Sequence, residues 1–200
     1  FLSLTILYML HMRYLFPIFI TLISWYVQGQ ADTSSTLEPF RDISTYPVTY
    51  TPENMVTRMI DGLGFRFYWA TDGLRPEDLA FRPTPASRSS EETIDHLMGL
   101  SNMILNCIQN KANVRSGEET SLLSFAQKRK ITLDNLLLAR ELLISGKVKV
   151  EDLKIILTKK DGVQELPVWN LINGPISDGL WHVGQLVTFR RSSGNPFDGK

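Results

Sequence analysis

Residues 89–108 read SSEETIDHLMGLSNMILNCI, and this stretch decides the fold class. Ser89 is followed three residues later by Glu92, which is the spacing of a capping box at the start of a helix. Two apolar stripes then run at helical spacing. The first is Ile94, Leu97, Met98, Ser101, Ile104 and Ile108, and the second is His96, Leu100, Met103 and Cys107. A helix that is apolar on two sides is contacted on two sides, which is typical of a helical bundle.

Three further helices are expected around this one. The first begins at Thr51-Pro52-Glu53, where Thr suits the N-cap and Pro the first helical position, and it ends around Gly73. Leu74–Ser87 contains three prolines and is predicted to be a connecting loop. A third helix spans roughly Ser121–Ser145, and the last begins after Asn173-Gly174-Pro175 and runs to about Arg191. A shorter helical piece over Pro167–Ile172 precedes it.

The apolar pattern changes its period between the third and last helices. Leu153–Thr158 and Val163–Leu166 flank the turn Lys159-Lys160-Asp161-Gly162, as in a small β-hairpin. The sequence therefore predicts an all-α protein, an up-and-down four-helix bundle with a small β-hairpin before the last helix.

Composition limits the classes of function. A length of 200 residues fits one domain, or one domain and a leader. Lys and Arg number 21, as do Asp and Glu, so nothing indicates a nucleic-acid partner or an anionic membrane surface. The single cysteine, Cys107, excludes an internal disulfide framework and a thiolate zinc cluster.

Residues 1–31 have the pattern of a secretory signal peptide. Arg13 is their only charged residue, Tyr14–Val27 is nearly all apolar, and Gly29-Gln30-Ala31 ends in small residues. Cleavage after Ala31 would give an exported protein, periplasmic or extracellular. Met12 offers an alternative start, with residues 1–11 upstream of it.

The alternative to cleavage is that residues 1–27 remain as an N-terminal membrane anchor, the one arrangement in which the membrane is a partner. Residues 32–50, rich in Thr, Ser and Pro, are expected to form an extended arm, and residues 51–200 the helical-bundle domain.

Two histidines and one aspartate are the candidate metal ligands. Asp178 and His182 lie four residues apart on the last helix, on one face, and can bind a single ion. His96 is the only other histidine after residue 31, and its level matches theirs if the two helices run parallel. Two histidines and a carboxylate leave coordination positions open for water. The alternatives are an ordinary Asp178–His182 ion pair and a histidine satisfied within the core.

Residues 178–191, DGLWHVGQLVTFRR, resemble the closing helix of the DinB-like (damage-inducible) four-helix metal-binding superfamily, which typically reads His-x-x-x-His-x-Gly-Gln followed by an aromatic residue and Arg. Ile94-Asp95-His96-Leu97 is similar to the family's first ligand position, and the resemblance covers about residues 51–196. It implies a metal site formed by His96, Asp178 and His182, with Asp178 in the place of a histidine.

The resemblance also implies a divalent cofactor, with zinc or nickel ahead of manganese or iron. Gln185, Trp181 and Trp69 are expected to support the ligands or to line the pocket, and no residue stands out as a catalytic acid or base. The expected function is an exported metal-dependent hydrolase or transferase acting on a small molecule. The alternative is a non-catalytic exported bundle for ligand binding or protein interaction. A homodimer is a further expectation.

Overall fold

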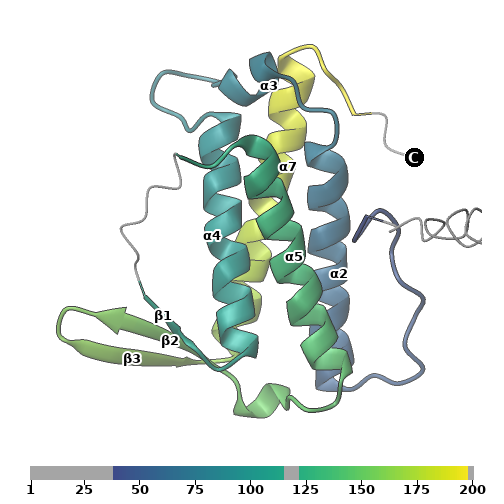
Figure 1. Cartoon of the computed structure of the whole chain (residues 1–200), viewed down its shortest axis with the longest axis vertical. Coiled ribbons are helices and arrows are strands. Elements are labelled where there is room, and N and C mark those ends of the chain that lie inside the picture. The colour runs from purple at the N-terminus through teal and green to yellow at the C-terminus, as the bar shows by residue number, and fades with distance from the viewer. Residues whose placement is uncertain (1–37, 115–121, 198–200) are drawn as a thin grey trace, which may run out of the picture. The chain divides into compact units, whose positions relative to one another are not determined.

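The computed structural model describes residues 38–114 and 122–197, so the predicted leader (1–31) lies outside the described residues. Four main helices dominate them (Figure 1). The helices are α2 (Pro52–Thr71), α3 (Pro76–Ala80), α4 (Ser90–Ile108), α5 (Phe125–Ile144), α6 (Trp169–Leu171) and α7 (Ser177–Ser192). The strands are β1 (Ala112–Asn113), β2 (Lys154–Lys159) and β3 (Gly162–Pro167).

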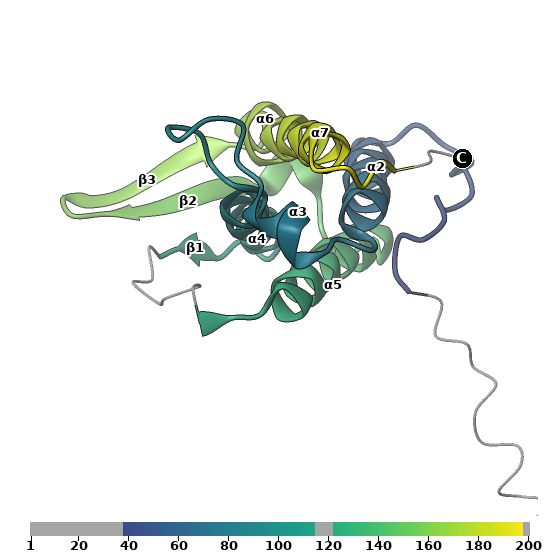
Figure 2. The same cartoon turned by 90° about the horizontal axis from the view of Figure 1, so that it is seen from above.

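The four long helices pack around one apolar core. α5 packs on α2 and α4, and α7 packs on the same two helices from the other side (Figure 2). Ile60, Phe67, Ile94, Ile104 and Leu136 are among the fully buried side chains. This packing of four helices, with a hairpin before the last one, confirms the coarse sequence prediction.

The helix directions correct the predicted up-and-down order. Lys128, near the start of α5, bonds to Glu91 at the start of α4, and Asn135 donates to Ser101 further along both helices. α4 and α5 therefore run in the same direction, and the connection between them is a crossover rather than a short turn. Periodicity fixes which faces of a helix are buried but not the direction in which it runs.

α4 and α7 run antiparallel. The rings of Phe81, just before α4, and Phe189, near the end of α7, are 5.9 Å apart. His96 and Asp178, which lie closer to the middle of α4 and the start of α7, meet at a lower level. The candidate ligands therefore meet without the parallel course that the sequence-based prediction makes a condition.

The sheet has one strand more than the sequence predicts. β2 and β3 form the expected antiparallel hairpin, with Lys159 opposite Gly162 across the turn. Ala112 and Asn113 of β1 pair in parallel with Ile156 and Leu157 of β2. A strand of two residues carries no alternation that could be recognised in the sequence.

A π-helical segment, Ile172–Ile176, joins α6 to α7. Pro175 lies within it, and the backbone at Gly174 departs from helical geometry (φ −97°, ψ −107°). α7 begins at Ser177, directly after this segment and close to the predicted start, and the helix has no side-chain N-cap. The predicted short piece before the last helix is observed as α6.

Local capping explains the other boundaries. Thr51 accepts a bond from the Asn54 amide at α2, and Ser89 with Glu92 closes the predicted capping box at α4. α5 starts after a second capping box, Ser124 with Gln127, so it is shorter than the range predicted from Ser121. The loop predicted over residues 74–87 contains the short helix α3.

The described part of the N-terminal arm, residues 38–50, packs on α2. The ring of Phe40 is buried over Gly64, where a Cβ would lie only 2.5 Å from that ring. The Trp69 indole donates to the carbonyl of Arg41. Among residues 38–114 and 122–197, no helix has the length and apolarity needed to cross a membrane.

Candidate metal centre

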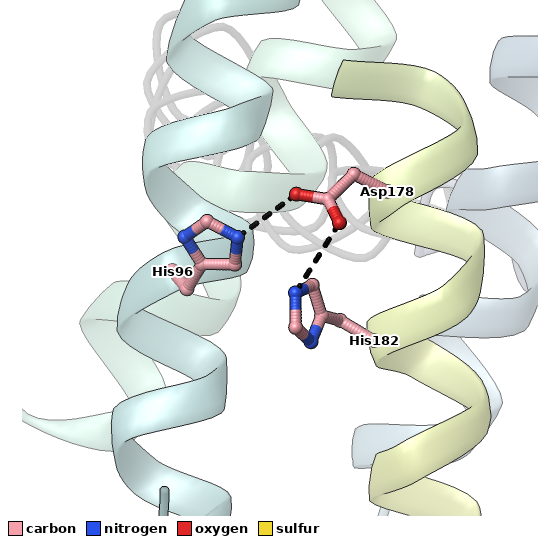
Figure 3. Close-up of side chains that lie close together, drawn as sticks. All are labelled: His96, Asp178 and His182. Atoms are coloured by element: carbon pink, nitrogen blue, oxygen red, sulfur yellow. Dashed lines mark hydrogen bonds and ion pairs between the residues drawn. The ribbon is translucent and has the colours of Figure 1, made fainter. Parts of the chain in front are cut away.

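The carboxylate of Asp178 lies between the imidazoles of His96 and His182 (Figure 3). One oxygen, Oδ2, is 3.0 Å from Nε2 of His96, and the other, Oδ1, is 3.4 Å from Nε2 of His182. The two rings meet edge to face, with centroids 4.6 Å apart. The structure therefore brings together the three residues that the sequence proposes as ligands.

The level at which α7 begins makes this meeting possible. The π-helical segment packs on α4 and α2, and α6 packs on the strands β2 and β3, before α7 starts. The first turn of α7 is thereby raised to the level of the second turn of α4. Asp178 and His182 are one turn apart on the side of α7 that faces His96.

The distances suit a single ion. One ligand atom from each side chain can be chosen so that all three lie within 4.8 Å of one another. Metal–nitrogen and metal–oxygen bonds of about 2.1 Å place neighbouring ligand atoms about 3.0 to 3.5 Å apart in tetrahedral or octahedral geometry. The 3.0 and 3.4 Å separations, one to each carboxylate oxygen of Asp178, fall in that interval.

The site is half-buried on one side of the bundle. The side chain of His182 is 15% exposed, whereas those of His96 and Asp178 are 31% and 34% exposed. Three ligands with access to solvent resemble catalytic metal sites, which keep a position for water, more than closed structural sites.

Gln185 orients one of the ligands, as the sequence suggests. Its Oε1 lies 2.8 Å from Nδ1 of His182, one turn further along α7. Metal-binding histidines characteristically donate their second ring nitrogen to an outer partner of this kind. Nε2 of His182 then faces Asp178.

The two tryptophans expected at the pocket differ in position. The ring of Trp181 lies nearly parallel to that of His182, with centroids 6.4 Å apart, and its side chain is 70% exposed. Trp69 instead lines a groove with Leu180 and Val187, which are on the other side of α7. Helical spacing alone could not place a residue of α2 relative to either side of α7.

Asp95 and Cys107, two further residues of α4 with possible ligand atoms, do not belong to the site. Asp95, adjacent to His96 in sequence, forms an ion pair with the buried Lys128 of α5 at 2.8 Å. Cys107 is fully buried, and desolvation raises the pKa of its thiol to about 11, so it is a core residue as predicted. Within the described ranges, His96, Asp178 and His182 form the only cluster with metal-ligand geometry.

Comparisons with protein families, with curated proteins and with solved structures found no match to this chain.

Proposed function

We propose that this protein is a divalent-metal-binding protein of the DinB-like type, with the ion held by His96, Asp178 and His182. The observation that carries the proposal is the convergence of three ligand side chains, from two helices far apart in sequence, within 4.8 Å. The proposed site does not depend on the order of all four helices, because its ligands come only from the antiparallel pair α4 and α7.

A simple ion pair accounts for less of this arrangement. The Asp178–His182 ion pair alone accounts for one ring, whereas both rings turn Nε2 toward Asp178. Gln185 holds the remaining nitrogen of His182. A single cation between the carboxylate and the two rings explains all three orientations together.

The donor set indicates the class of ion. Imidazole suits zinc, nickel and iron, and carboxylate suits harder ions such as manganese. With two nitrogen donors and one oxygen donor, zinc or nickel is the proposed cofactor, ahead of manganese or iron. Asp178 in the histidine position of the family motif favours harder ions more than three histidines would.

The accessible side of the site supports catalysis at the metal. An ion bound there would lower the pKa of a bound water and polarise a carbonyl or phosphoryl oxygen of a small-molecule substrate. The chain's own part is to hold the ion and to keep His182 oriented through Gln185. We therefore propose an exported metal-dependent hydrolase or transferase, with an exported ligand-binding bundle as the alternative.

Metal binding can be tested directly by elemental analysis and by calorimetric titration of the metal-stripped protein with zinc, nickel and manganese. One equivalent of metal is expected in the wild type, and loss of at least about tenfold in affinity in H96A, H182A and D178N. D134N removes an exposed aspartate of α5 and serves as the control. Absence of stoichiometric metal from the reconstituted wild type would rule out the proposal.

Catalytic potential has a separate test. Water proton relaxation in the manganese-loaded protein reports whether an exchangeable water occupies the ion. A water on the ion is expected. A loaded site without one would favour the ligand-binding alternative.

A further inference from the structure

The groove lined by Trp69 lies between α7 and α2, on the side of α7 away from His96, Asp178 and His182. Its volume is about 750 Å³. Its walls come from α2, α7 and the C-terminal segment. The apolar lining consists of Phe65, Trp69, Leu180, Val183, Val187 and Phe197. α2 and α7 run in the same direction, since Gly179 lies against Leu63 and Arg190 donates to the carbonyl of Ala70 further along both helices. Residues of both helices line the groove.

The lining of α7 forms a continuous stripe. Leu180, Gly184, Val187 and Arg191 succeed one another at spacings of three and four residues, so they share one face over about 16 Å. Gly184 leaves a gap in the middle, since a Cβ there would meet no atom within 4 Å. This gives the groove the depth to hold a slender chain.

Three arginines and one aspartate, Asp42, are the charged residues of the lining. Five other arginines form ion pairs with carboxylates: Arg58, Arg75, Arg82, Arg129 and Arg140. Arg41, Arg66 and Arg191 form no such pair within residues 38–114 and 122–197, and all three are exposed. Three of the five arginines that lack such a pair in those ranges therefore lie beside one apolar wall.

The charged end of the groove is near Trp69. The indole nitrogen donates to the carbonyl of Arg41, and the ring packs against Phe197 at 5.8 Å between centroids. Arg191 lies toward the same end, at the last turn of α7. Arg66 lies about one turn before Trp69 on α2, and its guanidinium donates to the carbonyl of Gly62. Arg41 and Arg191 are therefore placed to bind an anionic group at the end of the groove formed by Trp69 and Phe197.

We propose that this groove binds a free single-chain amphiphile with an anionic head, such as a medium-chain carboxylate. The alkyl chain lies along Leu180, Gly184 and Val187, and the head group pairs with Arg41 and Arg191. A guanidinium donates two parallel hydrogen bonds to a carboxylate, which gives the head both affinity and orientation. The apolar wall contributes the remaining binding free energy by removing the alkyl chain from water. None of the three metal ligands takes part.

Decanoate is the probe, with decanol as its neutral analogue, and the indole N–H signals in NMR spectra of the ¹⁵N-labelled protein are the readout. Decanoate should shift the Trp69 signal saturably and leave those of Trp169 and Trp181, both 70% exposed, in place. The W69F variant assigns the signal. Decanol should bind at least about tenfold more weakly, since it lacks the charge.

Two matched pairs of variants locate the site. G184L fills the groove without a clash and should abolish the shift, whereas G99L, an equally open helical glycine on α4, should leave it unchanged. R191Q should weaken decanoate binding about tenfold, and R88Q, in the loop before α4, should not. Undiminished binding in G184L, equal affinity for decanol, or equal shifts of the Trp69, Trp169 and Trp181 indoles would each overturn the proposal.

Discussion

Nδ1 of His182 lies 2.8 Å from Oε1 of Gln185 on the next turn of α7. An amide oxygen only accepts hydrogen bonds, so Nδ1 of the imidazole carries the proton in this contact. The lone pair of a neutral ring is then on Nε2, the atom that faces Asp178. Gln185 thus favours the tautomer of His182 in which Nε2, the nitrogen facing Asp178, is free to bind a metal ion.

Replacing Gln185 with Leu is expected to lower zinc affinity about 10- to 100-fold, because the ring loses the partner that fixes its tautomer and orientation. Q185E keeps an acceptor at that position and should retain affinity. Zinc titration calorimetry measures both. The hairpin variant Q164L controls for loss of a glutamine elsewhere, and wild-type affinity in Q185L would show that Gln185 does not position His182.

Asp178→His is expected to change which ion is preferred. A third imidazole in place of the carboxylate should raise affinity for zinc and nickel relative to manganese. Competition between zinc and manganese, followed by elemental analysis, gives the ratio directly. An unchanged ratio would mean that Asp178 does not bind the ion.

Two glycines of α7 should respond to alanine with opposite signs. A Cβ at Gly179 would lie 3.0 and 3.1 Å from the methyl carbons of the buried Leu63, so G179A is expected to lose about 1 kcal/mol after the gain in helix propensity. At Gly184 a Cβ meets nothing within 4 Å, so G184A should gain about 1 kcal/mol. Urea unfolding of the two variants tests the pair, and equal effects would contradict the close packing of α7 on α2.

The buried carboxylate of Asp78 in α3 makes the free energy of unfolding depend on pH in the acid range. Arg75 bonds to the fully buried Asp78, with Ser193 and Asn195 as further donors, and these bonds hold the pKa of Asp78 well below its usual range despite its burial. Because the folded-state pKa is lowered, the stabilisation is complete above the unfolded pKa of about 3.9 and is lost as the pH falls below it.

Asp78→Asn should therefore cost about 1 to 3 kcal/mol near neutral pH, and its difference from wild type should shrink as the pH falls from about 5 to about 3. Urea unfolding across that range measures the difference, with D161N in the hairpin turn as control. A constant difference over the whole range would exclude Asp78 as the titrating group.

Local signals in the sequence predicted much of the fold. Ser89 and Glu92 place the start of α4 correctly because a capping box uses only residues within one turn. The hairpin turn is correct for the same reason. β1 and the parallel course of α4 and α5 depend on contacts between distant segments, and nothing in the local pattern of Ala112 or Ser124 specifies them.

The candidate site was predictable in its residues but not in its geometry. Asp178 and His182 share a helix face by spacing alone, and His96 followed from the scarcity of histidine. Their common level required the position of α7 against α4, which depends on α6 and the π-helical segment. Trp69, expected to support the ligands or line the pocket, instead lines the groove with Leu180 and Val187. Its place depends on how α2 packs against α7, which helical spacing does not specify.

The number of residues in the π-helical segment fixes how α7 is rotated about its axis relative to α4. Each residue added to or removed from a helix turns everything beyond it by about 100°. Losing one residue between Ile172 and Ile176 would carry Asp178 and His182 away from His96 while α7 itself stayed helical. The segment contributes no ligand, yet its residue count sets the rotational phase of both ligands on α7. A single deletion there would separate the pair from His96 as completely as removing a side chain.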